Sequence, residues 1–559
     1  MLKKIILLIL VFTLSTHITY SQDIKELAIP SPQQFRWQEQ ERIMFVAIDP
    51  CTWQGREYDN HSTPLAEINP KELDTDQWCE TAKSWGAKEI LFVAKHTGGF
   101  CWWQTETTDY GIKDTPYKDG KGDVLKELSE SCKKYGLNLG VYVYPGDETW
   151  GAGIGSGGQT EDPTKQEAYN EVFRTQLEET LTNYGEIIEV WFDGSCVIDV
   201  SDIIEKYAKN AVIFQGPHAT IRWPGTEYGK LFYPAWNTVK SDDFKTGVST
   251  QIHGDPDGDV WAPLEANTTF YNHYWFWSEK GAKKRKTLDE LMECYYKSVG
   301  YGSVFLLNST PDTRGLITDE DRKLYKAFGD EIDRRFATPI SSIEDKHGQI
   351  IELDVPVNKK INHVIIMEDY QLGHRIRRYN IEGLVGGNWK ELSHGQSVGR
   401  KKIDYFDEVE VSKIRLNIIK SVNEPIIKKL SAYYVEDFVA PPVQDISAWS
   451  EWQDISDFNT DENAVIEIDL TGEIKMPGQF IIRVVPDNTD TKIKINNIEL
   501  IYDGRVVLEN FTTVKGNEIH INRTAQITDE SKIFLRFTIK GKKAFSGKIQ
   551  FKPALIYQE

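Results

Sequence analysis

Cysteine is scarce in this chain of 559 residues, and its placement argues against a small zinc-bound or disulfide-bound fold. The six cysteines are scattered between Cys51 and Cys294, and no two of them form a C-x-x-C pair. Structural zinc sites need ligands at such short spacing, so no zinc site of that kind is expected. A chain of this length can bury a large core without disulfides. We therefore expect the cysteines to be buried free thiols.

Long apolar runs are missing after the first 21 residues. Residues 1–21 begin with Lys3 and Lys4, continue with the apolar stretch Ile5–Leu14, and close with the more polar stretch Ser15–Ser21. That order is typical of a secretory signal peptide, and the apolar part is too short to span a membrane. No later stretch of about 18 apolar residues exists. The sequence predicts export by a signal peptide to the periplasm or the medium, with no membrane span.

Positive charge is in the minority, and several common site motifs are absent. The chain has 65 Lys and Arg against 85 Asp and Glu, a net charge of -20, which argues against nucleic acid as a partner. No G-x-G-x-x-G follows the first expected strand, so a nucleotide-binding sheet is disfavoured. The absence of H-x-H and H-E-x-x-H spacing disfavours a metal-dependent hydrolase. We expect neither a cofactor nor a catalytic metal.

What the chain does contain is a regular alternation of apolar strands and amphipathic helices from about residue 42 to residue 337. The expected strands are Ile43–Ile48, Ile90–Ala94, Leu139–Val143, Ile188–Phe192, Ala211–Phe214, Val260 with its neighbours, and Val304–Leu307. The expected helices are Asp74–Trp85, Val124–Tyr135, Thr164–Asn183, Ile203–Lys209, Leu288–Val299 and Asp319–Phe336. Seven or eight such units predict an α/β fold of the (β/α)8-like TIM barrel type.

Helical periodicity stops after Ala337. Residues 338–439 and 443–559 instead give short alternating strands separated by turns, a pattern typical of antiparallel β-sandwiches. Ala440-Pro441-Pro442 is interpreted as a stiff linker between them. The predicted organisation is a signal peptide at 1–21, a catalytic barrel at 22–337, and two all-β sandwich domains. For the first sandwich, packing support for the barrel is at least as well founded as carbohydrate binding.

Residues capable of chemistry follow the expected strands. Asp193 closes the fourth strand in the run Glu189-Val190-Trp191-Phe192-Asp193-Gly194. The carboxyl ends of barrel strands carry the active site, which makes Asp193 a candidate nucleophile, although Asp-Gly is also ordinary turn chemistry. Glu265 follows an apolar stretch, whose neighbours would raise the pKa of its carboxyl group and keep it protonated. A carboxylate and a carboxylic acid are the usual pair for glycoside hydrolysis, and the 16 Trp and 25 Tyr suit sugar binding.

Several segments together resemble the family 29 glycoside hydrolases, which are retaining exo-α-L-fucosidases, and the likeness is closest to the subgroup acting on α-1,3 and α-1,4 branches. The segments are Gly55-Arg56-Glu57-Tyr58, Lys95-His96 through Trp102-Trp103, Lys121 to Val124, Glu189 to Gly194, Ile221-Arg222-Trp223, Trp261 to Glu265, and Leu307-Asn308 through Gly315.

This resemblance implies residue roles. Asp193 falls on the nucleophile and Glu265 on the acid/base. Glu57, His96, Trp103, Tyr142 and Trp191 fall on sugar-binding positions, and Arg222 and Trp223 on the rim; Trp53, which follows the first strand, is a further candidate. The resemblance implies that no metal is needed and that the partner is an oligosaccharide or polysaccharide ending in α-L-fucose.

Three departures from the family pattern concern the sugar pocket. Ala47 and Gly146 stand where the family usually has a histidine and a tryptophan, and His96 is followed by Thr97-Gly98-Gly99 in place of His-Asp-Gly. Each change is toward a smaller group, so we expect a roomier pocket. Room beside the methyl group of fucose predicts an alternative substrate, an α-L-galactoside or a substituted fucose. A second alternative is a carbohydrate-binding protein that has lost catalysis.

Overall fold

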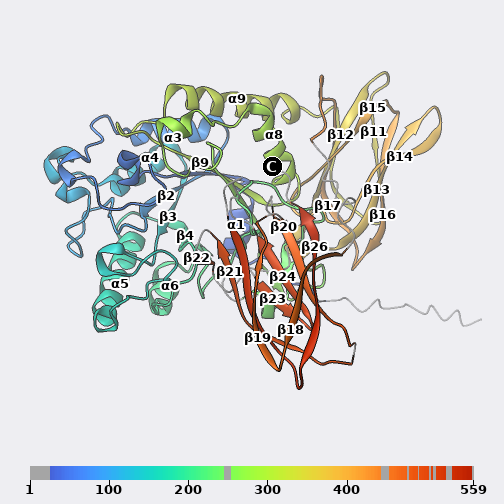
Figure 1. Cartoon of the computed structure of the whole chain (residues 1–559). Coiled ribbons are helices and arrows are strands. Elements are labelled where there is room, and N and C mark those ends of the chain that lie inside the picture. Colours follow the sequence, from blue (N-terminus) through green and yellow to red (C-terminus); the bar gives the residue numbers. More distant parts are fainter. Residues whose placement is uncertain are drawn as a thin grey trace, which may run out of the picture.

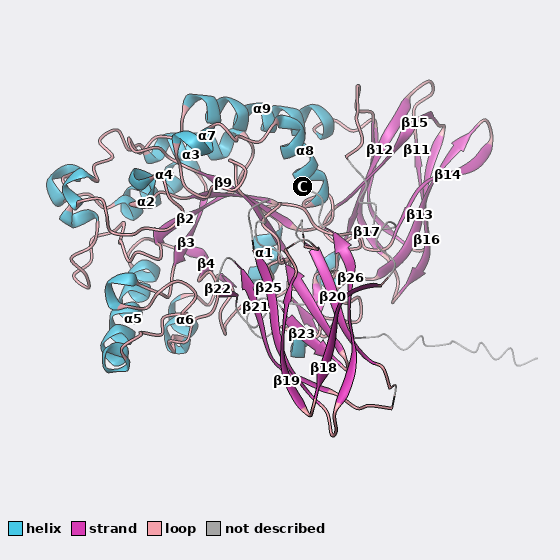
Figure 2. Cartoon of the chain, in the orientation of Figure 1, coloured by secondary structure: helices cyan, strands magenta, loops and turns pink. Residues whose placement is uncertain are grey.

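The computed structural model describes residues 26–244, 253–441 and, with short gaps, 452–556. A barrel of strands and helices is followed by two all-β units, which extend from it in different directions (Figures 1 and 2). Residues 1–21 lie outside the described residues, as does most of the stretch that joins the two all-β units. Among the described residues, no helix is both long and apolar enough to cross a membrane.

The barrel is built on a parallel sheet of seven strands in the order β5-β4-β3-β2-β1-β9-β8. Their bounds are β1 Arg42–Val46, β2 Glu89–Lys95, β3 Asn138–Val143, β4 Ile187–Trp191, β5 Val212–Phe214, β8 Glu265–Thr268 and β9 Val304–Ser309. The stretch around Arg222 closes the gap between the two edges, because Ile221 bridges to Phe214 of β5 and Arg222 bridges to Leu264 beside β8. The predicted barrel fold is confirmed.

Helices surround this sheet. They are α1 Pro32–Gln38, α2 Cys51–Gln54, α3 Thr75–Ser84, α4 Val124–Tyr135, α5 Gln166–Thr182, α6 Ser201–Tyr207, α7 Glu279–Ala282, α8 Leu288–Lys297 and α9 Asp319–Phe336. The local sequence sets several ends: Asp74 and Asp123 cap the first backbone amides of α3 and α4, and Gly136 ends α4 in the left-handed conformation. The short helix α1 precedes β1, and its Trp37 is buried among side chains inside the barrel.

The sixth predicted strand needs correction. Val260 lies in β7 (Val260–Trp261), which pairs antiparallel with β6 (Thr238–Val239) outside the barrel sheet. The barrel strand is β8, which begins at Glu265 and runs through Ala266, Asn267 and Thr268. These four residues are buried but mostly polar, so an apolar-run criterion cannot find them.

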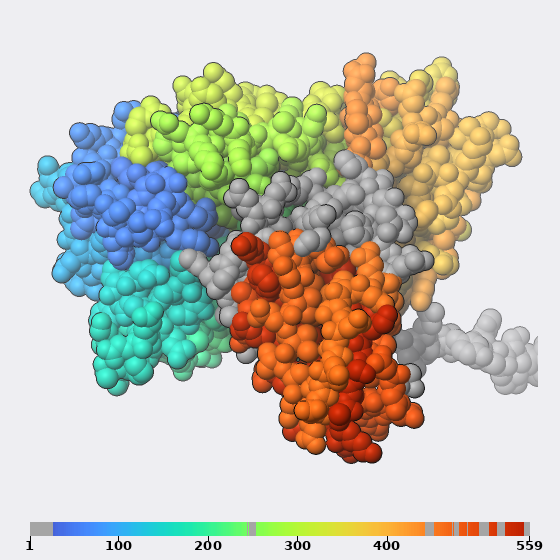
Figure 3. Space-filling model, in the orientation of Figure 1, coloured from blue at the N-terminus to red at the C-terminus, as the bar shows by residue number. Residues whose placement is uncertain are grey.

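The first sandwich packs tightly on the barrel. One sheet holds β10 Ser341–His347, β17 Ile426–Tyr433, β12 Lys360–Glu368 and β15 Lys402–Glu410, and the other holds β11 Ile350–Asp354, β16 Lys413–Ser421, β13 Ile376–Val385 and β14 Asn388–Gly395. Tyr296 of α8 and His363 of β12 are joined by a 2.7 Å hydrogen bond, and Arg400 pairs with Glu39 and Glu41 beside β1. Figure 3 shows this unit lying against the helices at the end of the barrel segment. It therefore supports the barrel.

The second sandwich has its own core. Its sheets are β18 Gln453–Thr460, β26 Phe545–Ile556, β20 Gly478–Pro486, β24 Glu518–Arg523 and β23 Thr512–Lys515, facing β19 Asn463–Asp469, β25 Ile533–Lys540, β21 Lys494–Tyr502 and β22 Arg505–Val507. Alternate residues of β25, Ile533, Leu535, Phe537 and Ile539, are fully buried between the sheets. That period of two is the pattern expected for a strand with one face in the core.

All six cysteines of the protein are buried free thiols, as predicted.

Candidate active site

A pocket opens at the carboxyl ends of the barrel strands. Its wall is formed by twelve residues: Phe45, Ala47, Glu57, Tyr58, Val93, His96, Tyr142, Trp191, Asp193, Glu227, Trp275 and Phe276. We call this cavity the sugar pocket. Its floor is aromatic, since Phe45, Tyr142 and Trp191 pack with ring centroids 5.4–5.9 Å apart. Flat rings below and carboxyl groups around the mouth suit a ligand that is apolar on one side and rich in hydroxyls on the other.

Asp193 lies at the end of β4 with a positive φ of 49°, which is unusual for an aspartate. The turn continues through Gly194, whose amide donates to the side chain of Gln215. This backbone directs the carboxylate into the pocket, where the hydroxyl of Tyr142 donates to its Oδ2 at 2.8 Å. Asp193 is open to solvent through the mouth, yet loss of hydration raises its pKa, while the Tyr142 hydrogen bond acts in the opposite direction.

Two further carboxyl groups, Glu57 and Glu227, line the same pocket. Trp275 joins them: its backbone amide donates to Glu57 at 3.4 Å, and its indole N–H donates to Glu227 at 3.3 Å. Burial, the charge of Glu227 and, less strongly, the charge of Asp193 raise the pKa of Glu57 to about 8. The carboxyl group of Glu57 therefore keeps its proton at neutral pH and lies in the same pocket as Asp193.

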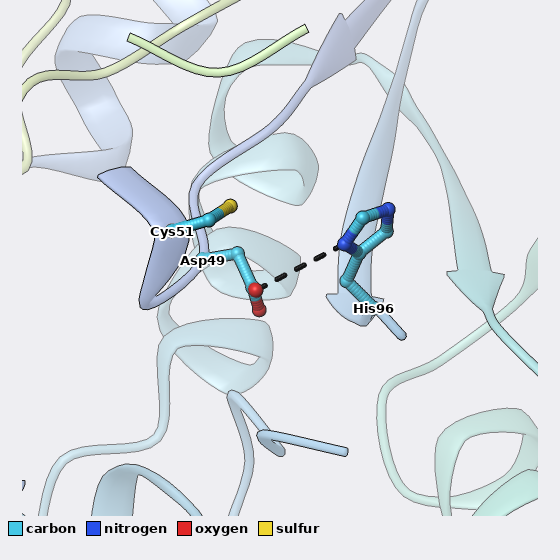
Figure 4. A group of neighbouring side chains, drawn as sticks. All are labelled: Asp49, Cys51 and His96. Atoms are coloured by element: carbon cyan, nitrogen blue, oxygen red, sulfur yellow. Dashed lines mark ion pairs between the residues drawn. The ribbon is translucent and has the colours of Figure 1, made fainter. Parts of the chain in front are cut away.

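His96 forms part of the pocket wall and is neutral, because burial lowers its pKa to about 3. Behind it lie Asp49 and Cys51, and one donor atom of each of the three residues lies within 4.8 Å of the others (Figure 4). Within the described part of the chain this is the one group with the spacing of a metal site. Nitrogen, sulfur and carboxylate donors together suit a transition metal or zinc more than Ca²⁺ or Mg²⁺. The 3.9 Å from Nδ1 of His96 to Oδ2 of Asp49 is too long for a hydrogen bond.

Glu265, the second carboxyl group predicted for catalysis, does not line the sugar pocket. It is fully buried, and its Oε1 accepts the indole N–H of Trp191 at 3.2 Å. Its carboxyl group also hydrogen-bonds Glu189, which in turn accepts the indole N–H of Trp37 from α1. The ring of Trp191 thus faces the pocket while Glu265 lies on its other side, toward α1. Burial raises the pKa of Glu265 to about 8, which is the direction expected from its apolar neighbours, but its carboxyl group lies outside the wall of the pocket.

Four other predicted residues also lie outside the pocket wall. Trp103 is fully buried and bonds Glu179 of α5, and Trp53 stacks on Trp102. Arg222 is buried and donates to the backbone carbonyl of Trp236, so it is not a rim residue. The indole of Trp223 donates to Asn267. These side chains hold the loops around the pocket in place. The resemblance alone could not tell whether a residue positions a loop or contacts a sugar.

Of the three places where smaller residues replace those usual in the family, one leaves space in the pocket wall, and at the other two neighbouring groups fill the space. Ala47 lies in the pocket wall. A side chain at Gly146 would instead meet the Ala152 carbonyl and the Tyr144 ring, each 2.7 Å from its Cβ. Side chains at Gly98 and Gly99 would collide with the carboxylates of Asp59 and Asp147. Neighbouring groups therefore occupy the space behind the glycines, and only Ala47 widens the sugar pocket.

Sequence reasoning missed Glu227, Tyr58, Trp275 and Phe276. Glu227 follows the closing stretch Ile221-Arg222-Trp223 and a Pro224-Gly225 turn, so its place after the fifth strand was a usable signal. Trp275 and Phe276 follow β8, which an apolar-run criterion cannot detect. Tyr58 lies beside the recognised Glu57 and stacks on His96 with centroids 6.0 Å apart.

Comparisons with known proteins show which family the chain resembles. The family described as alpha-L-fucosidase matches residues 32–334, more than half of the chain. "Alpha-L-fucosidase 1" of Arabidopsis thaliana is 29% identical over 456 residues, covering 73% of this chain and 88% of the plant protein. A putative alpha-L-fucosidase from Bacteroides thetaiotaomicron has a solved structure that is 33% identical, with a TM-score of 0.69 over 74% of this chain and 100% of that one. A Ruminococcus gnavus fucosidase solved in complex with fucose is 27% identical, with a TM-score of 0.65 over 74% of this chain and 96% of that one.

The match of the family model over the whole barrel decides the assignment, and the aromatic pocket with its three carboxyl groups is the chemistry that a glycosidase needs. This chain belongs to the alpha-L-fucosidase family of glycoside hydrolases.

Proposed function

We propose that the protein is a retaining exo-α-L-fucosidase that removes terminal α-L-fucosyl residues from oligosaccharides or polysaccharides. The observation that carries this proposal is the sugar pocket itself, whose wall combines the carboxyl groups of Asp193, Glu57 and Glu227 with aromatic rings. The floor of Phe45, Tyr142 and Trp191 ends the pocket inside the barrel. A pocket closed at one end accepts the end of a glycan chain, which supports exo action.

Asp193 is the proposed nucleophile. Its carboxylate attacks the anomeric carbon, the bond to the leaving oxygen breaks, and a covalent glycosyl ester forms on Asp193. The hydrogen bond from Tyr142 orients the attacking carboxylate and helps to keep it ionised. In the second step a water molecule attacks the same carbon and releases Asp193, so the sugar leaves with its original anomeric configuration.

Glu227 is the proposed acid/base, in place of Glu265. A general acid must reach the glycosidic oxygen, and Glu227 lies in the pocket wall, whereas Glu265 lies behind Trp191. Glu227 donates its proton to the leaving oxygen and later takes one from the attacking water. Glu57 stands next to it, and burial together with the charge of Glu227 raises the pKa of Glu57.

Azide rescue of two variants tests these roles. Asp193→Gly with azide is expected to yield a glycosyl azide of inverted configuration, because azide replaces the missing nucleophile. Glu227→Ala with azide and an aryl fucoside is expected to yield an azide of retained configuration, because azide attacks the covalent intermediate. A retained azide from Glu265→Ala, with full activity in Glu227→Ala, would return the acid/base role to Glu265.

An α-L-galactoside or a substituted fucose is the second candidate substrate. It is favoured by Ala47 alone, which leaves space in the pocket wall. Hydrolysis of aryl α-L-fucoside and aryl α-L-galactoside should be compared for the wild-type protein and for Ala47→Leu. Galactoside turnover that Ala47→Leu removes selectively supports this candidate, and a fucoside preference in both proteins rejects it. Loss of catalysis, the other alternative, is disfavoured because all three pocket carboxyl groups are present.

Export by residues 1–21 is also proposed, from the order of charge and hydropathy in that segment. N-terminal sequencing of the protein recovered from outside the cytoplasm tests it. A mature chain that begins shortly after Ser21 is expected, and an intact Met1 would contradict export by cleavage.

A further inference from the structure

The segments after β1 and β2 bring three different kinds of metal ligand together. The two strands pair in parallel, so the residues that follow them lie side by side at the carboxyl ends of the barrel strands. Asp49 and Cys51 follow β1, and His96 is the first residue after β2. One donor atom of each of the three residues lies within 4.8 Å of the others, and Figure 4 shows the carboxylate of Asp49 directed toward Nδ1 of His96.

The carboxylate of Asp49 is the group that points to a bound ion. It is completely buried, and neither of its oxygens accepts a hydrogen bond of normal geometry. The nearby carboxylate of Asp59, in contrast, accepts hydrogen bonds of 2.7 Å from Gln54 and from Tyr110. Buried carboxylates lose their hydration, so they are normally hydrogen-bonded, paired with a cation or bound to a metal. We propose that Asp49, Cys51 and His96 bind a divalent metal ion of the zinc type, at a site separate from the proposed catalytic carboxyl groups.

The electrostatic surroundings of the three residues favour a cation. Burial and the charge of Asp59 raise the pKa of the Asp49 carboxyl group, and weaker contacts with Cys51 and Trp102 oppose them. Burial and nearby carboxylates, Asp49 first among them, likewise raise the pKa of the Cys51 thiol. A dication stabilises both groups in their ionised forms. With one carboxylate, one thiolate and one neutral imidazole, the bound site carries no net charge, which suits its complete burial.

The donor atoms and their spacing narrow the identity of the metal. Thiolate and imidazole donors suit zinc and its neighbours among the transition metals, whereas Ca²⁺ and Mg²⁺ take oxygen ligands. In a tetrahedral zinc site with bonds of about 2.0–2.3 Å, the ligand atoms lie roughly 3.3–3.8 Å apart. The 3.9 Å from Nδ1 of His96 to Oδ2 of Asp49 is close to that range. Rotation of the Asp49 side chain can close the remaining difference, because no hydrogen bond of normal geometry holds its carboxylate.

The backbone fixes two of the ligands, and the third gives access to the site. The carbonyl of Asp49 accepts the amide of Thr52 at 2.8 Å, and the Thr52 hydroxyl accepts the amide of Asp49 at 3.4 Å. This turn holds Asp49 and Cys51 in place relative to each other. His96 forms part of the wall of the sugar pocket, so an ion reaches the group from that pocket. When the ion binds, the thiol proton of Cys51 passes to solvent and the metal–sulfur bond takes its place.

Titration of the metal-free protein with Co²⁺ tests the site. Co²⁺ is a close substitute for Zn²⁺, and its bond to a thiolate gives a charge-transfer absorption band that carboxylate and imidazole ligands do not give. We expect a single thiolate-bound Co²⁺ per chain, displaced by Zn²⁺ but not by an equal concentration of Mg²⁺ or Ca²⁺. Cys51→Ser should abolish the band. Asp49→Asn should weaken Co²⁺ binding by more than about 100-fold, because loss of a group that only supports a ligand already costs about 10- to 100-fold.

A second buried thiol provides the matched control. Cys294 lies in α8 and donates to the backbone carbonyl of Tyr228, so Cys294→Ser should keep the Co²⁺ band. Thermal unfolding midpoints of the metal-free variants show whether each is folded. The wild-type titration needs no variant, so a wild-type protein without a thiolate band overturns the proposal even if Cys51→Ser does not fold. A band that persists in folded Cys51→Ser also overturns it, and displacement of Co²⁺ by Mg²⁺ overturns the proposed class of metal.

Discussion

The hydroxyl of Tyr142 donates a hydrogen bond to Oδ2 of Asp193 at 2.8 Å, and this contact joins the aromatic floor of the sugar pocket to its candidate nucleophile. Burial raises the pKa of Asp193, while this hydrogen bond lowers it. The tyrosine itself stays protonated, since burial and the charge of Asp193 raise its pKa. The contact therefore orients the carboxylate and favours its ionised form.

Removing this hydroxyl with Tyr142→Phe is expected to lower kcat/KM for an aryl fucoside by about 10- to 100-fold, because a hydrogen bond to a charged group contributes about 1.5–3 kcal/mol. The pKa of Asp193 would rise further, so the acidic limb of the pH–rate profile should move to higher pH. Tyr144→Phe is the matched control, since the Tyr144 hydroxyl accepts the amide of Gly155 and does not bond Asp193. An unchanged acidic limb in Tyr142→Phe would contradict this role.

The basic limb of the same profile should report the carboxyl group of Glu57. Burial and, after it, the charge of Glu227 raise the pKa of Glu57 to about 8. The protonated carboxyl group can donate a hydrogen bond to a sugar hydroxyl, and this donor is lost as the pH rises through about 8. Glu57→Gln cannot ionise, so this limb should disappear from the profile of the variant. A limb that stays near pH 8 in Glu57→Gln would show that another group is responsible.

Glu265→Gln is expected to keep activity within about tenfold of the wild-type protein, because an amide oxygen can still accept the Trp191 indole N–H. Glu227→Gln should lose about a hundred- to ten-thousand-fold of its activity on a fucosylated oligosaccharide, the range for a lost general acid. The two variants exchange one carboxyl group for one amide, so each is the control for the other. Equal losses in both would contradict the assignment of Glu227.

Glu265 should also affect stability. Its pKa is raised by burial from an ordinary value near 4.5 to about 8, so the folded protein holds a proton that the unfolded chain releases. This contribution is fully present below about pH 4.5 and is lost as the pH rises through about 8. Thermal unfolding midpoints of the wild-type protein should fall across that window, and Glu265→Gln should reduce the fall. A variant with the same pH dependence as the wild-type protein would show that Glu265 is not the group responsible.

The contact between Arg400 of the first sandwich and Glu41 beside β1 tests the supporting role of that domain. Glu41 is almost completely buried, and the charges of Lys401, Arg400 and Arg42 lower its pKa despite the opposing effect of burial. Arg400→Met should destabilise the protein by about 1–3 kcal/mol, because it removes one of the two cations that pair with the buried Glu41 and leaves Lys401 as the other. Lys360→Met, which breaks an exposed pair with Glu408, should cost less than about 1 kcal/mol. The free energies of unfolding of both variants can be measured by chemical denaturation. Equal losses in Arg400→Met and Lys360→Met would contradict the supporting role of the first sandwich.

Most of the barrel strands and the position of Asp193 could be predicted from local sequence patterns. The strands around Met44, Leu91, Val141 and Val190 are continuous apolar runs, because parallel strands of a barrel are buried on both faces. Asp193 was found because it follows such a run. The polar strand β8 was missed because Glu265, Asn267 and Thr268 are buried by the closure of the barrel, which no local period reveals.

The candidate catalytic carboxyl groups show the same difference between what local sequence predicts and what packing decides. The sequence by itself determined the barrel fold, the carboxylate at the end of β4 and the resemblance to the family. These features depend on local periodicity and on short sequence motifs. Only the tertiary structure decided that Trp191 separates Glu265 from the pocket, that Glu227 enters it, and that Asp59, Asp147 and Ala152 fill the space beside the glycines. These outcomes depend on which segments, distant along the chain, pack against one another, and a side chain at the end of a strand can turn toward either end of the barrel with the same local sequence.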